Sequence, residues 1–192
     1  MEDKKMKLNL KKFALAAVIA AVCSCPSLFA NGLDNKNAIG MYIIGAETPV
    51  GGIQYERRFT DIFSTKFGTY IYYSNSDNYI GTPVTFNFTV QPDFTLFETS
   101  WKEKVCSRLF AFGLVGYEYD LIRDSHWDDT LGKTVTENAK NRHSLITGAG
   151  FGFDFIFFGH LSVPIQFGFM GTINDTDPNV GFGAGIAIRY SW

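Results

Sequence analysis

Two places in the sequence bring a serine beside a histidine, residue types that act as nucleophile and general base in hydrolytic enzymes. The first pair is Ser125 and His126, preceded by Asp124, and the second is His143 and Ser144. Neighbouring side chains on a strand point to opposite faces, so neither serine can reach the histidine beside it. We therefore expect polar decoration of loops at these positions and assign no catalytic residue.

Metal and cofactor chemistry has little support in the sequence. Asp124, Asp128 and Asp129 could attract a cation at the surface, but they lack the spacing of a calcium-binding loop. The sequence has no Cys and His cluster, phosphate loop or dinucleotide fingerprint, so we expect neither a metal nor a cofactor. Its formal net charge of −2 also lacks the basic surplus of a nucleic-acid-binding protein.

The segments that carry the polar residues have the period of β-strands. The chain holds 19 Phe, 9 Tyr and 19 Gly, and after residue 30 no apolar run approaches the roughly 20 residues of a membrane helix. Strand side chains alternate between two faces, and the last thirteen residues show this pattern clearly. Their even positions form an apolar face: Val180, Phe182, Ala184, Ile186, Ile188, Tyr190 and Trp192.

Eight segments alternate in this way. They cover residues 38–46, 50–59, 65–73, 84–96, 108–122, 144–158, 161–173 and 180–192. The fourth contains Pro92, which cannot donate to a ladder and therefore predicts a bulge within one strand. We predict an all-β fold, a closed antiparallel up-and-down transmembrane β-barrel of eight strands, with ten strands as the alternative.

The connections alternate between long and short. The segments 75–82, 124–142 and 174–179 are rich in polar residues, whereas those at 60–64, 102–106 and 159–160 are shorter turns. In single-chain transmembrane barrels the long loops lie outside the cell and the short turns face the periplasm. We therefore expect the three long loops to be extracellular and to offer the surface for a ligand.

Charged residues occupy the faces opposite to the apolar ones. The set predicted to point into the barrel is Glu56, Arg58, Lys66, Glu118, Asp120, Asp154 and Arg189. Eight strands enclose a space just wide enough for side chains, and buried charges must be paired. We therefore interpret the set as an ion-paired core, with a charged pore or a ligand site as the alternative. Inward glycines on two strands would leave room for long side chains: Gly148, Gly150, Gly152, Gly181, Gly183 and Gly185.

The first thirty residues have the order of a secretory signal peptide. Several lysines precede the apolar run 13–22, and the small residue Ala30 ends the segment. We expect cleavage after Ala30, with residues 31–192 forming the barrel. An uncleaved anchor and a lipoprotein modified at Cys25 are the alternatives. After cleavage Cys106 is the one cysteine left, so no internal disulfide is expected.

The end of the chain resembles the terminal strand of bacterial outer-membrane barrels, which the barrel-assembly machinery reads during insertion. The matching residues are Ile186, Ile188, Tyr190 and Trp192, with Trp where Phe is usual. From residue 38 onward the chain resembles the small eight-stranded barrels typified by OmpX, OmpW and the membrane domain of OmpA.

The resemblance implies an outer-membrane location and lipid as the surrounding partner. It implies a structural or surface-interaction protein that is not an enzyme. A narrow channel for small or apolar solutes, as in OmpW-like barrels, is the alternative. A lipid-modifying enzyme is less favoured, because the residues around His126 and His143 do not match the His-x-Ser-Asn pattern of the lipid A deacylases.

Overall fold

The computed structural model describes residues 32–45, 50–73, 81–101, 105–123, 125–128, 132–136, 138–174 and 178–192. The predicted signal peptide, its cleavage site and Cys25 lie outside these ranges. A short 3-10 helix, η1 (Gly32–Asp34), precedes the strands. The described residues contain no helix long and apolar enough to cross a membrane.

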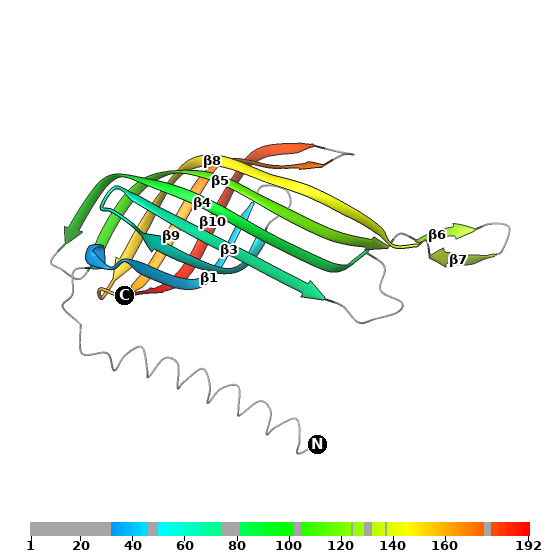
Figure 1. Cartoon of the computed structure of the whole chain (residues 1–192), viewed down its shortest axis with the longest axis horizontal. Helices are drawn as coiled ribbons and strands as arrows, with labels where there is room; N and C mark the ends of the chain where they lie inside the picture. The colour runs from blue at the N-terminus through cyan, green and yellow to red at the C-terminus, as the bar shows by residue number, and fades with distance from the viewer. Residues whose placement is uncertain are drawn as a thin grey trace, which may run out of the picture.

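Eight antiparallel strands close into a barrel in the order β1-β10-β9-β8-β5-β4-β3-β2. The barrel strands are β1 (Asn37–Gly45), β2 (Val50–Arg58), β3 (Phe63–Tyr73), β4 (Gly81–Trp101), β5 (Val105–Arg123), β8 (Lys140–Phe157), β9 (Leu161–Asn174) and β10 (Asn179–Ser191). Figure 1 shows these strands wrapped around one interior, with η1 and the C-terminus at the same end. The predicted eight-stranded up-and-down barrel is confirmed.

The distribution of side chains is the reverse of that in a water-soluble protein. Phe169, Phe182 and Ile188 are exposed on the outer face, whereas Arg189 and Lys66 are each only 1% exposed inside the barrel. An apolar exterior is stable in hydrocarbon, where only a closed barrel or a helix satisfies every backbone N–H and C=O. The fold is therefore that of a membrane-spanning barrel with a polar interior.

The fourth strand runs through Pro92 as predicted, but the bulge is not at the proline. The β4–β5 ladder omits Pro92 and resumes in the same register at Asp93. The register shifts between Thr95 and Phe97, which makes Leu96 the extra residue. Pro92 removes one hydrogen-bond donor without displacing the chain, whereas the bulge reverses which face the following residues occupy.

The structure also changes some predicted boundaries. The connection 124–142 contains a two-stranded hairpin, β6 (Ser125–Asp128) with β7 (Lys133–Thr136), which Figure 1 shows projecting beyond the barrel. The predicted turn 102–106 is shorter, because Cys106 lies within β5. Phe63 and Ser64, predicted in a turn, already belong to β3. Pairing with a neighbouring strand continues past the point where the apolar alternation fades.

A row of glycines runs across β8, β9 and β10 at one level. Gly150 pairs with Phe112 on one side and with Gly168 on the other, and Gly168 pairs in turn with Gly183. A Cβ at Gly150 would lie 2.2 Å from the carbonyl oxygen of Phe167. The strands approach one another too closely there for any side chain. This explains why glycine is needed at this level.

Gly150→Ala is expected to destabilise the barrel by about 1–3 kcal/mol, since the methyl group must displace backbone atoms. Gly113→Ala is the matched control, because its Cβ would meet only the Pro92 ring at 4.0 Å. Urea unfolding in lipid vesicles measures both. Equal midpoints for the two variants would contradict the steric explanation.

Candidate functional site

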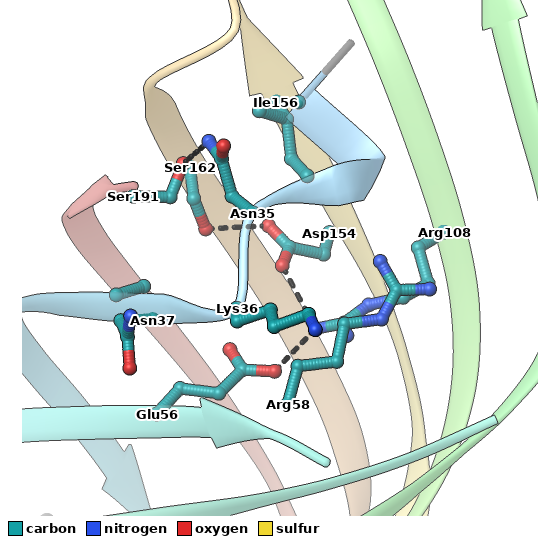
Figure 2. A pocket seen from close by; sticks show the side chains of 12 residues that line it. Asn35, Lys36, Asn37, Glu56, Arg58, Arg108, Asp154, Ile156, Ser162 and Ser191 are labelled. Atoms are coloured by element: carbon teal, nitrogen blue, oxygen red, sulfur yellow. Dashed lines mark hydrogen bonds and ion pairs between the residues drawn. The ribbon is translucent and has the colours of Figure 1, made fainter. Parts of the chain in front are cut away.

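Four charged side chains form a closed arrangement in the lumen, which we call the charge quartet: Glu56, Arg108, Asp154 and Arg189. Each arginine contacts both carboxylates. Arg108 lies 2.7 Å from Glu56 and 3.1 Å from Asp154, and Arg189 lies 2.6 Å and 2.9 Å from the same two residues. Figure 2 shows Glu56 and Asp154 directed toward the Arg108 guanidinium. The quartet is electrically neutral and entirely buried.

Neutral polar groups add further hydrogen bonds to the quartet. The Ser162 hydroxyl donates to Asp154 at 2.7 Å and accepts from Arg189 at 2.9 Å. The Gln54 carbonyl oxygen accepts a further bond from Arg189 at 3.3 Å. A buried ion pair tolerates desolvation only when its remaining donors and acceptors also find partners, and these residues supply several of them.

A second ion pair lies beside the quartet. Lys66 contacts Asp93 at 2.6 Å, and both side chains are 1% exposed. The Gln91 amide donates to Asp93 at 2.9 Å and exchanges hydrogen bonds with Gln166 at 3.0 and 3.1 Å. The Lys66 ammonium also lies 4.0 Å from the centroid of the Phe110 ring, within range of a cation–π interaction. Together the two groups draw polar side chains from seven of the eight barrel strands.

The segment before β1 covers the lumen at the end that holds η1 and the C-terminus, which we call the terminal end. Arg58 binds the carbonyl oxygens of Leu33 and Asp61 and pairs with Glu98. The Asn35 amide donates to the Gly159 carbonyl and to Ser191. Between this segment and the quartet remains a cavity of about 20 Å³, which is room for roughly one water molecule (Figure 2).

Beyond the charges the lumen contains a cluster of buried apolar side chains. The buried side chains of this apolar layer are Tyr42, Ile44, Phe110, Phe112, Leu114, Ile146, Met170 and Ala187. Glycines on β8 make room for it, since a Cβ at Gly152 would lie 2.4 Å from the Phe110 ring. The predicted role of these inward glycines therefore holds for aromatic rings of β5. Buried polar side chains of β4 lie beside this layer, and one of them, Thr89, has its hydroxyl 3.4 Å from that of Tyr42.

The opposite end of the lumen, the loop end, carries a separate polar group. Arg142 contacts Asp120 at 2.6 Å, and Thr85 donates to the same carboxylate at 2.8 Å. The Arg142 side chain is 42% exposed, so water screens this pair far more than the quartet. Tyr117 and His143 lie on the outer face nearby, with the phenol oxygen 2.6 Å from the imidazole Nδ1.

The seven residues predicted to point inward fall into two groups. Glu56, Asp154 and Arg189 meet in the quartet, and Lys66 and Arg58 lie next to it. The other two stand at the loop end, where Asp120 is buried and Glu118 is only half-buried.

Sequence reasoning missed three charged members of the lumen. Arg108 occupies an even position of β5, as Glu118 and Asp120 do. Extending the same alternation to the start of the strand predicts that Arg108 points inward. Asp93 stood on the predicted polar face of β4 but was not singled out. Glu98 follows the bulge, which turns it inward, and no residue pattern marked the bulge at that place.

The serine and histidine candidates do not form a catalytic pair. Ser144 is buried in the lumen, whereas His143 is exposed on the outer face beside Tyr117. Ser125 and His126 are consecutive residues of β6. Asp124 and Asp129 lie outside the described residues. Within the described ranges, no group of three or more His, Cys, Asp or Glu side chains is placed to hold a metal ion.

The residues of the predicted insertion signal lie along one face of β10. Ile186, Ile188 and Trp192 are exposed on the outside of the barrel. The Tyr190 ring stacks on Trp192 at 6.0 Å and on His160 at 5.3 Å. The three rings form an aromatic cluster at the terminal end, the position of an interfacial girdle.

Several solved structures are similar to this chain. The N-terminal β-barrel domain of Pseudomonas aeruginosa OprF has a TM-score of 0.44 and 12% identity, covering 81% of this chain and 97% of that one. Ail, the attachment invasion locus protein of Yersinia pestis, has a TM-score of 0.38 and 14% identity, covering 82% of this chain and 97% of that one. Neisserial surface protein A has a TM-score of 0.37 and 12% identity, covering 82% of this chain and 95% of that one. No protein-family model and no curated protein matches the chain.

The strand order and the inverted burial of the chain itself decide its architecture. It is a small eight-stranded β-barrel of the outer-membrane type. In such a barrel the lumen residues are in contact with one another and not with lipid, so their chemistry depends on whether they leave a path for water. Here the charge quartet and the apolar layer fill the space between the two ends.

Arg189→Ala is expected to destabilise the barrel by about 3–5 kcal/mol, because Glu56 and Asp154 would each lose a buried partner. Arg142→Ala, which removes the half-exposed arginine of the loop-end pair, is the comparison and is expected to cost less, because the Arg142 side chain is 42% exposed and water screens its charge. Urea unfolding in detergent compares the two. A wild-type midpoint for Arg189→Ala would show that water already solvates the quartet.

Proposed function

We propose that this protein is a non-conducting barrel of the bacterial outer membrane that anchors and presents its loop-end connections outside the cell. The observation that carries the proposal is the filled lumen. The charges of the quartet balance within it, and the apolar layer lies directly beyond. A pore needs an open path for water, and a lumen packed with side chains supports a structural role instead.

The orientation follows from the lengths of the connections. At the terminal end β8 and β9 are joined by the turn 158–160, in which Phe158 and Gly159 have positive φ angles of 52° and 75°. At the loop end β5 and β8 are joined through the β6–β7 hairpin. Short turns in the periplasm and longer loops outside match the usual asymmetry, with export directed by a leader cleaved after Ala30.

The presented surface includes the hairpin and the connections 75–82 and 174–179. A ligand or another cell surface would contact these parts, because they lie at the end away from the periplasm. The sequence candidate His143 and Ser144 gives catalysis no support, since the two side chains lie on opposite faces of β8. The alternative, a narrow channel for small or apolar solutes, requires the apolar layer to open.

Purified full-length protein in planar lipid bilayers is expected to give no single-channel openings, since ions would have to cross the apolar layer. Phe110→Ala with Phe112→Ala removes two rings of that layer and is expected to produce brief openings. An open porin prepared in the same detergent controls for insertion. Stable openings of the wild-type protein would favour the channel instead.

Trp192→Ala is expected to lower the amount of folded protein in the outer membrane of cells several-fold, while refolding into detergent stays near normal. The substitution keeps the main-chain hydrogen bonds of Trp192 with Lys36 and Asn37, so it removes only the ring that resembles an insertion signal. Phe182→Ala is the matched control, because that ring is also exposed on β10. Equal outer-membrane levels of wild type and Trp192→Ala would contradict this assignment.

A further inference from the structure

Polar side chains from neighbouring strands lie in one row of the ladder near the loop end. Tyr70 of β3 pairs with Asn87 of β4, Asn87 pairs with Glu118 of β5, and Glu118 pairs with Ser144 of β8. The alternation of each strand places these side chains on the lumen side. Asn87 and Ser144 are only 1% and 3% exposed, and Glu118 is half-buried. We call Asn87, Glu118 and Ser144 the acceptor row.

Two oxygen atoms of the acceptor row are buried without a hydrogen bond. They are Oδ1 of Asn87 and Oγ of Ser144. Burying a polar atom without a partner costs free energy, and folded proteins rarely leave one unless water, an ion or a ligand supplies the partner. Both residues stand directly opposite Glu118 in their ladders, where Cβ atoms are about 5 Å apart. The two oxygens therefore flank the Glu118 carboxylate.

That carboxylate remains for a ligand because Arg142 binds Asp120 instead. Nε and Nη2 of Arg142 lie 3.2 and 2.6 Å from one Asp120 oxygen, and Thr85 donates to the other oxygen at 2.8 Å. Glu118 is the next inward residue of β5, farther from the loop end. Two carboxylates and one guanidinium give these three side chains a net charge of −2 + 1 = −1. One monovalent cation would balance it.

We propose that the acceptor row binds the primary ammonium group of a small amine. An ammonium group has three N–H donors, and the row offers a carboxylate, an amide oxygen and a hydroxyl as acceptors. Acceptors around one ammonium nitrogen lie about 4.6 Å apart, which matches side chains on adjacent strands. Calcium or magnesium would need about six or more oxygens at roughly 2.0–2.6 Å, a larger and tighter set than the row provides.

The surroundings of the acceptor row favour an amine that carries an alkyl chain. Tyr70 ends the row on the β3 side and is 37% exposed. Gly52 leaves room beside it, since a Cβ there would lie 2.9 Å from the Cβ of Tyr70. An aromatic ring in this position can contact the alkyl chain and attract the cationic charge. Access from outside the cell rests on the orientation proposed above, whereas binding itself does not.

Isothermal titration calorimetry of the folded protein in an uncharged maltoside detergent tests the binding. We expect n-butylammonium to bind, and tetramethylammonium, which has the same charge but no N–H group, to bind about ten-fold more weakly or less. Equal affinities for the two ions would overturn the proposal, as would binding of calcium without binding of butylammonium. The measurement needs neither a membrane nor a cell, so its failure is distinct from failure of the proposed anchoring function.

Glu118→Gln keeps the size of the side chain, removes its charge and is expected to weaken butylammonium binding about ten-fold. Asp128→Asn removes a negative charge from β6 and is the matched control, expected to bind as wild type does. Heat-modified gel mobility shows that each variant is folded. Equal losses of affinity in the two variants would mean that the amine responds only to overall charge, which contradicts a site at the acceptor row.

Asn87→Leu separates binding from stability. The substitution removes a buried oxygen that lacks a partner, so we expect the barrel to unfold at the same or a higher urea concentration. We expect the same variant to bind butylammonium several-fold more weakly. Unchanged binding, together with a lower unfolding midpoint, would show that Asn87 serves the fold alone and would overturn its assignment to the site.

Discussion

The structure depends on closing the sheet, because an open strand edge in hydrocarbon would leave N–H and C=O groups without partners. Closure is made by β1 and β10, which pair from Ala38–Ser191 to Gly45–Ala184. Main-chain bonds between Asn37 and Trp192 extend this seam beyond the last strand residue. Because the seam joins the first strand of the barrel to the last, no closed form can exist until the C-terminal strand has been made. The aromatic cluster at that end stands where closure is completed.

Closure also fixes the volume that the inward side chains must fill. With eight strands the lumen has room for side chains but not for a column of water, so residue sizes on facing strands must complement one another. β5 contributes Arg108, Phe110 and Phe112, whereas β8 places glycines on the facing positions 150 and 152. Large residues on one strand are thus matched by missing side chains on its neighbour. The filling is asymmetric: the quartet and the Lys66–Asp93 pair lie on the terminal side of the apolar layer, whereas Asp120 lies at the loop end.

Alternation with a period of two predicted the strands, their number and most inward positions, because each side chain of a barrel strand points either into the lumen or outward. It could not predict which charges meet. Glu56 and Arg108 come from strands that are not neighbours in the ladder, and their contact across the lumen depends on the stagger of the whole barrel. The bulge at Leu96 and the β6–β7 hairpin were missed for a related reason. Both arise from pairing with another strand and leave no apolar period in the sequence.

Because side chains fill the lumen, a ligand would have to bind at the surface. One part of that surface, the β6–β7 hairpin, continues directly from two paired barrel strands. The β5–β8 ladder is continuous from Val105–Phe157 to Ile122–Lys140, and the β6–β7 hairpin is inserted between these two strands. The ladder therefore fixes the two strand ends from which the hairpin continues, while the hairpin itself forms a separate two-stranded sheet. A densely packed interior stiffens the β5–β8 wall from which the hairpin continues. The quartet and the apolar layer hold the wall that carries the presented hairpin.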